Sequence, residues 1–400
     1  MTSGDVSRLA HVPSYAGTVT SFTMVIFLAS TSAFMPAPVL TELAQSFGTT
    51  VPVMGQLTAV TSLPWAIAAP LFGPVSDRYG RAPVLMYGLL ALGLATVWSG
   101  LAWDLPSLFA ARLVAGVAAA AAMPTTMTTV GDLFAGIQRA RALGWVNSGF
   151  SIASLVGLPL IALAAGLVNW RLAFVIVGVC LLLLEFPVVR MLRHVHASKG
   201  DSGPRVGYAG LLRSPGTLAL LGANVSERVL FGAVTTYLPA LLVERYSISI
   251  SAVAPLLSVI AIGSLAGNLV GGRLSGRLRT VHLFGICQLL AAVCAAFVFF
   301  GVPYLWLTAL LAAALGCANA ASRPTYLALV MAISGKARGT MIGMFSLTNH
   351  LGLTLGAMLG GFTISWAGYG AVAGLVLAAG AGAALISQGG EPRDRPAEPQ

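Results

Sequence analysis

Long apolar runs separated by short polar turns occupy almost the whole chain. A helix of about 20 apolar residues crosses the hydrocarbon of a bilayer, and a search at this length gives twelve runs. They lie at 17–39, 52–73, 83–103, 106–130, 141–166, 171–189, 214–241, 249–272, 281–301, 304–332, 340–366 and 368–388. Over such lengths only helices satisfy their own backbone polar groups in lipid. We therefore predict an all-α membrane protein with twelve transmembrane helices.

The polar turns repeat between the two halves of the chain. The charged turn that begins at Gly73 returns at Gly272, and the same shift of 199 residues carries Arg139 onto Arg338. Coincidences at one ungapped shift indicate an internal duplication, and hence two pseudo-symmetric six-helix bundles. We divide the chain into an N-terminus (1–16), a first bundle (17–189), a linker (190–213), a second bundle (214–388) and a disordered tail (389–400).

The composition excludes a water-soluble protein. Charged residues make up 8% of the chain and the mean hydropathy is +0.87, whereas soluble proteins carry about 25% charged residues. In a soluble chain the net charge of +10 would suggest a nucleic-acid partner. Here the basic residues lie in short loops between apolar runs, so membrane topology explains them and we expect no nucleic acid.

The positions of the basic residues predict the orientation. With both termini in the cytoplasm, seventeen Lys and Arg residues of the loops and termini lie inside and only Arg171 and Arg245 lie outside. Cytoplasmic loops carry such an excess of basic residues. We expect a multi-pass protein of the cytoplasmic membrane with both termini inside.

Catalytic and metal-binding patterns are not found in the sequence. The four cysteines lie within apolar runs without metal-ligand spacing, so we expect no disulfide, no metal and no cofactor. No HExxH, GxSxG or P-loop pattern occurs, which argues against an enzyme and against an ATP-driven pump. A sensor or scaffold would be expected to carry a soluble domain, which the chain lacks.

The turn after the second run resembles a family motif. It reads Gly73-Pro-Val-Ser-Asp77-Arg78-Tyr-Gly80-Arg81-Ala-Pro-Val-Leu85. It is similar to the pattern G-x-L-A-D-R-x-G-R-K-x-x-L of the major facilitator superfamily, and it departs from that pattern at Val75, Ser76 and Ala82. The resemblance covers the whole chain and implies a transporter of two six-helix bundles that works by alternating access.

Two further motifs resemble one branch of that superfamily. Arg112 lies in Leu108-x-x-x-Arg112-x-x-x-Gly116, which is similar to the fourth helix of the drug:proton antiporters. The fifth run contains Gly157-Leu158-Pro159, whereas the antiporters have Gly directly before Pro. The Gly-x-Pro form looks more like the metabolite- and sugar-efflux branch, so the resemblance implies export without specifying a drug.

The charged turn has two interpretations. Asp77 could dock at the positive N-terminus of the helix that begins near Arg338-Gly339 and latch the cytoplasmic mouth. Alternatively the turn is an interfacial one, and Arg78 and Arg81 anchor it to lipid headgroups. The full motif match favours the latch, and we count Gly73, Asp77, Arg78, Gly80, Arg81, Gly157 and Pro159 as gating residues.

Ionisable residues inside the spans are the candidates for function, because such residues are costly in lipid. Two helical faces carry polar stripes: Asn224, Glu227, Arg228 and Phe231 in the seventh span, and Asn319, Ser322, Arg323 and Tyr326 in the tenth. The resemblance implies that helices 1, 4, 7 and 10 line a central cavity. We expect both stripes to meet Arg112 and the Ser30-Thr31-Ser32 patch there, around the substrate.

Glu227 is the candidate proton-coupling carboxylate, and a permanent structural pair with Arg228 or Arg323 is the alternative. His350 could titrate near neutral pH, although a satisfied packing histidine is the commoner case. Trp65 and Met123 could line the cavity, although aromatic and methionine side chains in a membrane core are usually packing. Three arginines and one carboxylate in one cavity favour a substrate with an anionic group.

The function expected from these features is secondary active export of a small amphiphilic drug or metabolite by proton antiport, as in multidrug resistance. The alternative is a transporter of a small organic anion that is coupled to protons or works by exchange. Such a transporter could also operate in the uptake direction. The expected partners are the small-molecule substrate, protons and the lipid bilayer, and we expect a monomer.

Overall fold

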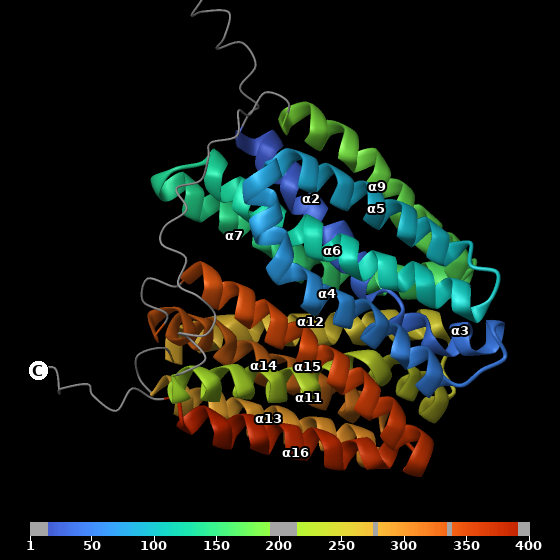
Figure 1. The fold of residues 1–400 in the computed structure, drawn as a ribbon. Helices are drawn as coiled ribbons and strands as arrows, with labels where there is room; N and C mark the ends of the chain where they lie inside the picture. Colours follow the sequence, from blue (N-terminus) through green and yellow to red (C-terminus); the bar gives the residue numbers. More distant parts are fainter. Residues whose placement is uncertain (1–14, 193–213, 275–278, 334–337, 391–400) are drawn as a thin grey trace, which may run out of the picture.

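The computed structural model describes residues 15–192, 214–274, 279–333 and 338–390, and all regular secondary structure in these ranges is helical (Figure 1). The first half contains α2 (Tyr15–Phe34), η2 (Ala37–Val39), α3 (Leu40–Ser46), α4 (Val51–Tyr79), α5 (Arg81–Gly100), α6 (Leu105–Leu133), α7 (Gly136–Ile152), η3 (Ala153–Gly157), α8 (Leu158–Leu167) and α9 (Trp170–Leu192). The second half contains α11 (Pro215–Tyr246), α12 (Ile250–Leu274), α13 (Thr280–Gly301), α14 (Leu305–Ile333), α15 (Arg338–Ala367) and α16 (Tyr369–Gln388).

Twelve helical segments of the described chain are long and apolar enough to cross a membrane, which confirms the expected all-α fold. Two of these spans are composite. The first runs through α2, η2 and α3, where Pro36 and Pro38 interrupt the α-helical hydrogen bonds. The fifth runs through α7, η3 and α8, with a π-helical turn over Ala153–Gly157.

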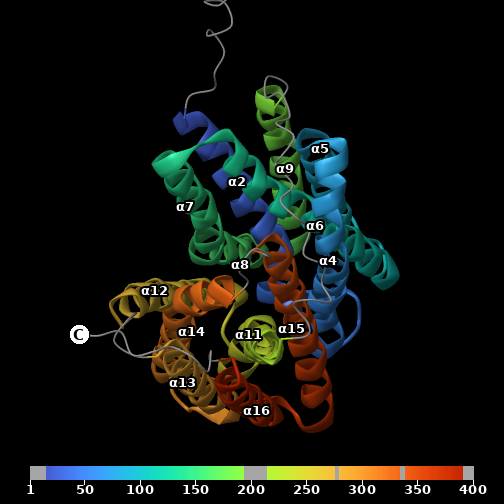
Figure 2. The ribbon, with the colours of Figure 1, turned by 60° about the vertical axis from the view of Figure 1, so that its left-hand side comes forward.

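The helix bounds repeat with the shift found in the sequence. α4 begins at Val51 and α12 at Ile250, and α5 begins at Arg81 and α13 at Thr280, so each pair lies 199 residues apart. α9 and α16 begin with the same separation. The two halves form two helical bundles that lie one above the other in Figure 1 and are seen from another side in Figure 2. The first three residues of the expected linker 190–213 end α9, and the rest of it, 193–213, lies outside the described residues.

Both ends of the described chain, Tyr15 and Gly390, lie at one end of the bundles, which we call the terminal end (Figure 1). The opposite end is called the far end. Basic residues of the described loops and helix ends gather at the terminal end: Arg78, Arg81, Arg139, Arg141, Arg190, Arg273 and Arg279. The orientation of these ends in the membrane remains a prediction from the positive-inside rule.

The two far-end arginines both bind the ends of helices. Arg171 donates through Nη1 to the carbonyls of Gly100 (3.2 Å) and Ala102 (2.5 Å), at the end of α5. Arg245 donates to the carbonyls of Val298 (2.7 Å) and Phe299 (3.0 Å), near the end of α13. The last carbonyls of a helix lack intrahelical partners and carry partial negative charge. These two exceptions to the basic-inside pattern therefore serve as helix caps.

The contacts between the bundles are close around Tyr237 of α11. A Cβ added at Gly55 of α4 would lie 2.1 Å from the Tyr237 hydroxyl, and one at Gly361 of α15 would lie 2.5 Å from it. That hydroxyl donates to the carbonyl of Ala357 at 2.7 Å. Since Gly55 lies in the second turn of α4, these contacts join the bundles toward the far end.

Candidate functional site

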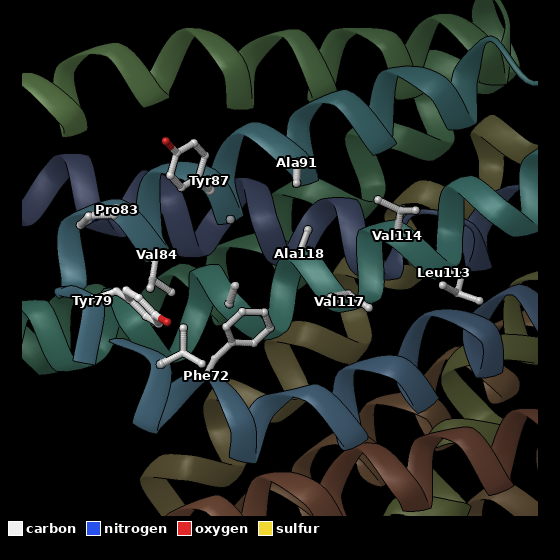
Figure 3. Close-up of a pocket in the computed structure, with 13 residues that line it drawn as sticks. Phe72, Tyr79, Pro83, Val84, Tyr87, Ala91, Leu113, Val114, Val117 and Ala118 are labelled. Atoms are coloured by element: carbon white, nitrogen blue, oxygen red, sulfur yellow. The ribbon is translucent and has the colours of Figure 1, made fainter. Parts of the chain in front are cut away.

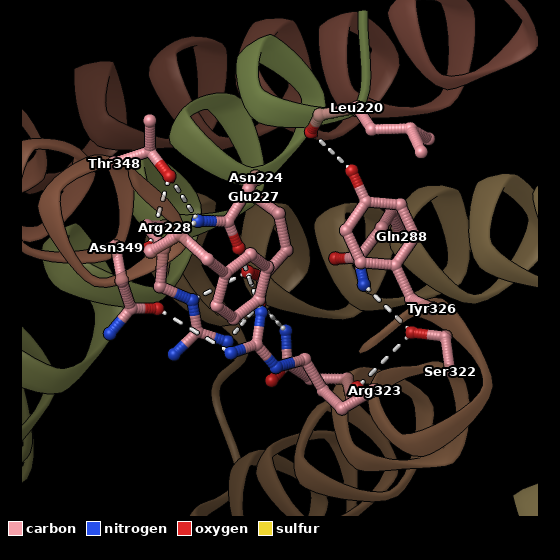
Figure 4. A network of polar contacts seen from close by, with 12 residues as sticks. Leu220, Asn224, Glu227, Arg228, Gln288, Ser322, Arg323, Tyr326, Thr348 and Asn349 are labelled. Atoms are coloured by element: carbon pink, nitrogen blue, oxygen red, sulfur yellow. Dashed lines mark hydrogen bonds and ion pairs between the residues drawn. The ribbon is translucent and has the colours of Figure 1, made fainter. Parts of the chain in front are cut away.

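A buried carboxylate between two guanidinium groups is the centre of the polar network (Figure 4). Glu227 on α11 is fully buried, and both of its oxygens accept hydrogen bonds from the neighbouring Arg228. Arg323 on α14 donates from Nη1 to Oε2 at 3.1 Å, and Asn319, one turn away, donates to Oε1 at 2.7 Å. The carboxylate is thus held by two cations and one amide from two helices.

Further side chains accept hydrogen bonds from the guanidinium of Arg323. Its Nη1 donates to Oδ1 of Asn224 at 3.0 Å, and its Nη2 donates to Oδ1 of Asn349 on α15 at 3.4 Å. Asn224 in turn donates to the Thr348 hydroxyl at 2.9 Å. The network therefore joins α11, α14 and α15 within the second bundle.

Aromatic rings cover the two guanidinium groups. The Arg228 guanidinium lies over the ring of Phe231, 4.5 Å from its centroid, and that of Arg323 lies 5.4 Å from the centroid of Phe345. Cation–π contacts of this kind stabilise a cation and leave the edges of the planar guanidinium available for hydrogen bonds. The rings of Phe231 and Phe345 thus lie beside the charged network of Glu227, Arg228 and Arg323.

The charges of this network do not cancel. Two arginines face one carboxylate, which leaves one positive charge at a site about 18 Å along α11, counted as twelve residues at 1.5 Å each from Pro215. The Arg323 side chain is 25% exposed, whereas those of Arg228 and Glu227 are 9% and 0% exposed. An uncompensated charge at this depth is costly unless it faces water or an anion.

The internal repeat does not duplicate this charge cluster in the described helices of the first bundle. α11 and α14 begin 200 residues after α2 and α6, and this separation places Phe27, Leu28 and Met123 of the first bundle at the positions of Glu227, Arg228 and Arg323. None of these three can carry charge. The three charges of this network therefore have no charged counterparts at the repeat positions of the first bundle.

Five of the residues expected at the site are brought together by the structure: Asn224, Glu227, Arg228, Asn319 and Arg323. Tyr326 is not among them. Its ring stacks on Phe284 with centroids 4.0 Å apart, and its hydroxyl donates to the carbonyl of Leu220. Because this ring is fully buried, Tyr326 packs α14 against α13 and α11.

Arg112 lies elsewhere, in the first bundle. Its Nη2 donates to the carbonyls of Ser32 (2.9 Å) and Ala33 (3.3 Å), and its Nε donates to the Thr61 hydroxyl at 3.2 Å. Those carbonyls belong to the last turn of α2, so the fully buried Arg112 caps a helix as Arg171 and Arg245 do. The structure thus places two of the three expected arginines around the carboxylate.

His350 lies between the bundles. Its imidazole stacks on the indole of Trp65, with ring centroids 4.0 Å apart and planes inclined by 22°. Both side chains are buried, and neither His350 Nδ1 nor Trp65 Nε1 has a hydrogen-bond partner among the described residues. Trp65 is the middle residue of α4, so the stack joins the halves about midway along that helix.

The charged turn between α4 and α5 is sharp. Gly80, at φ +94°, separates the two helices, and Arg81 forms an ion pair with Asp132 at the end of α6. Arg78 is exposed, and its guanidinium lies 5.4 Å from the centroid of the Tyr79 ring. The side chains of Asp77, Arg338 and Gly339 lie outside the described residues, so the latch stays a prediction.

The Gly157-Leu158-Pro159 motif opens a backbone carbonyl toward the other bundle. Pro159 has no N–H to donate to the carbonyl of Leu155, four residues earlier. The hydroxyl of Ser258 on α12 donates to this carbonyl at 3.4 Å. A Cβ at Gly157 would lie 2.4 Å from the Thr31 hydroxyl of α2, so only glycine permits this approach.

Two residues that take part in these contacts, Thr348 and Asn349, were not among the candidates from the sequence. Asn349 directly precedes His350 in a span, and that adjacency was the available signal. Trp65 was named from the sequence for cavity lining or packing, and its stack on His350 was not predicted.

The family model described as Major Facilitator Superfamily matches residues 22–278 and 220–400. The chain belongs to the major facilitator superfamily. The family assignment confirms the resemblance drawn from the charged turn and shows a transporter rather than an enzyme.

Three proteins illustrate the similarity. A chloramphenicol resistance protein of Streptomyces lividans is 31% identical over 251 residues, which cover 62% of this chain and 64% of that protein. A 3-(3-hydroxy-phenyl)propionate transporter of Escherichia coli (strain K12) is 28% identical over 245 residues, 60% of each chain. The crystal structure of a bacterial homologue of the human lysosomal transporter Spinster, in an inward-facing and occupied conformation, matches with a TM-score of 0.73 and 17% identity. That match covers 92% of this chain and 94% of the other, and shows the same fold.

Proposed function

We propose that this transporter carries a small organic anion across the cytoplasmic membrane by alternating access, with both termini in the cytoplasm. The observation that carries the proposal is the net positive charge left by Arg228 and Arg323 around the single carboxylate of Glu227. Arg323 is the contact residue in this proposal, because it is the more exposed of the two guanidinium groups.

The chemistry of the network fits an anion. Arginine presents a planar fork of donors that matches a carboxylate or phosphate in two parallel hydrogen bonds. Arg323 now donates from Nη1 to Glu227 and Asn224, and from Nη2 to Asn349. The bond to Asn349 is the longest of these three. A substrate carboxylate would displace Asn349 at low cost and compete with Glu227 for the guanidinium.

This exchange of partners would couple binding to movement. The contact with Asn349 ties α14 to α15, and α15 also carries His350 of the stack with Trp65. An anion that draws Arg323 away from Asn349 therefore loosens one link between the site and the helix that contacts the first bundle. A ligand shifts such an equilibrium only as far as it binds one state better than the other.

The similarity to known transporters narrows the class of organic anion that we propose as substrate. One of them is named for 3-(3-hydroxy-phenyl)propionate, an aryl carboxylate. The rings of Phe231 and Phe345 beside the two guanidinium groups would suit the aromatic part of such a molecule. We therefore propose small aryl carboxylates as the first substrates to test.

Export of an amphiphilic drug by proton antiport is the second candidate. The similarity to a chloramphenicol resistance protein favours it. In this mechanism Glu227 would take up a proton in one conformation. It would first have to leave two guanidinium groups and Asn319, and this requirement makes it the second choice.

Exchange in proteoliposomes tests the proposal. Vesicles with purified full-length protein are loaded with an unlabelled aryl carboxylate, and uptake of the labelled compound is followed for the wild type, Arg323→Gln, Arg323→Lys and the exposed control Arg141→Gln. We expect exchange in the wild type and the control, at least tenfold loss in Arg323→Gln, and partial activity in Arg323→Lys. Absence of anion exchange by the wild type, together with proton-driven chloramphenicol efflux that Glu227→Gln abolishes, would establish the second candidate instead.

A further inference from the structure

An apolar groove lies in the first bundle, away from the charged network. It has a volume of about 660 Å³ and lies between α4, α5 and α6 (Figure 3). Its walls include Phe72 and Tyr79 of α4, Val84 and Tyr87 of α5, and Leu113 and Val117 of α6. The side chains that line it are apolar, apart from the hydroxyl groups of the two tyrosines.

Small residues give the groove its depth. Gly88 of α5 packs so closely on α6 that an added Cβ would lie 3.0 Å from the backbone nitrogen of Ala122. Gly88, Ala118 and Ala121 form part of the lining, so no bulky side chain fills the space between the two helices. The groove therefore results from close helix packing, and larger residues at its rim enclose it.

The groove runs along the outer surface of the bundle, from Tyr79 at the terminal end to Leu113, the ninth residue of α6. Its rim residues Tyr79, Tyr87 and Leu113 are 65%, 63% and 48% exposed. Tyr79 is the last residue of α4, and Pro83 in the lining lies in the first turn of α5. The positive-inside rule assigns this end to the cytoplasm, so the groove faces the acyl region of the inner leaflet.

A cation lies beside the rim. The exposed guanidinium of Arg78 lies over the ring of Tyr79, which lines the groove. An apolar groove that faces lipid is filled by an acyl chain, and a basic residue at headgroup depth attracts an anionic lipid. We propose that an anionic phospholipid of the inner leaflet binds here, with one acyl chain in the groove and its phosphate at Arg78.

The position of the groove gives this lipid a structural role. The terminal half of α4 contains Pro70 and Pro74, each of which removes a backbone donor, so this half is held by fewer hydrogen bonds than an ordinary helix. This half contributes Phe72 and Tyr79 to the groove. A bound acyl chain packs the weakened half of α4 against α5 and α6, next to the turn that the family motif marks.

Lipid binding to the purified full-length protein tests the proposal without any transport measurement. Native mass spectrometry is used to titrate dioleoyl phosphatidylglycerol and dioleoyl phosphatidylcholine. Val117→Trp fills the groove from α6, and Val179→Trp places the same substitution at a similarly exposed position of α9 outside it. Arg78→Gln removes the cation, with Arg141→Gln as the control for charge.

We expect the wild type to retain phosphatidylglycerol at least tenfold more tightly than phosphatidylcholine. Val117→Trp should lower phosphatidylglycerol binding at least tenfold while Val179→Trp leaves it unchanged, and Arg78→Gln should remove the preference for the anionic lipid. A phosphatidylglycerol carrying a photoactivatable acyl chain should label a peptide of α4, α5 or α6 that borders the groove. Equal binding by Val117→Trp and the wild type, or labelling elsewhere only, would overturn the proposal.

Discussion

The imidazole of His350 lies flat against the indole of Trp65, and this contact joins α15 of one bundle to α4 of the other. Neither ring places its buried nitrogen on a partner among the described residues. The contact between the two side chains is therefore made by the faces of their rings. Any movement that separates α4 from α15 at this height must break it.

Replacement of Trp65 should shift the balance between closed and open arrangements of the bundles. Trp65→Leu removes the stack, which for an aromatic pair contributes about 0.5–1.5 kcal/mol. We expect the bundles to separate more often along α4 and α15, whereas Trp65→Phe, which keeps a ring, should stay close to the wild type. Distances between spin labels on these two helices measure the populations, and unchanged distance distributions in Trp65→Leu would contradict this role.

Glu227→Gln should destabilise the protein, because it leaves two guanidinium groups without a counter-charge. Removal of one partner from a buried ion pair costs about 3–5 kcal/mol. Arg323→Gln should cost less, since the pair of Glu227 with Arg228 remains. Thermal unfolding of the purified protein measures both effects. A saturating organic anion should restore part of the stability lost in Glu227→Gln, and no restoration would argue against anion binding at this network.

The variant Arg112→Gln tests whether Arg112 caps a helix or binds the substrate. The Arg112 guanidinium holds the last carbonyls of α2, and hydrogen bonds to charged groups contribute about 1.5–3 kcal/mol. We expect a lower unfolding temperature with an unchanged dissociation constant for the anion. Arg323→Gln should instead raise the dissociation constant for the anion. A loss of anion affinity in Arg112→Gln would place Arg112 in the binding site.

Gly55→Ala should prevent the far end from closing. The added methyl group would lie 2.1 Å from the Tyr237 hydroxyl, so α4 must move away from α11. Spin labels at Thr50 and Trp366 should report longer distances than in the wild type. Gly374→Ala on α16, where nothing lies within 4 Å of the added Cβ, is the matched control and should leave the distances unchanged.

Several features follow from the sequence because they depend on local pattern. Apolar runs of membrane length fix the twelve spans, and the shift of 199 residues reappears in the starts of α12, α13 and α16. The motif from Gly73 to Leu85 led to the correct family. The stripes at Asn224–Arg228 and Asn319–Arg323 met as expected, because residues three and four apart share one helical face.

The remaining features depend on which side chain reaches which neighbour across helices. The sequence around an arginine in a membrane span does not show what its side chain binds. Arg323 binds a carboxylate, whereas Arg112 binds a helix end. The stack of Trp65 with His350 and the close contacts of Tyr237 with Gly55 and Gly361 join residues more than a hundred positions apart. No local sequence pattern encodes such pairs. The sequence by itself determined a twelve-helix transporter with its charge in the second half, because hydropathy and repeat are properties of the chain. Only the tertiary structure decided which charges meet, since that depends on the packing and rotation of neighbouring helices.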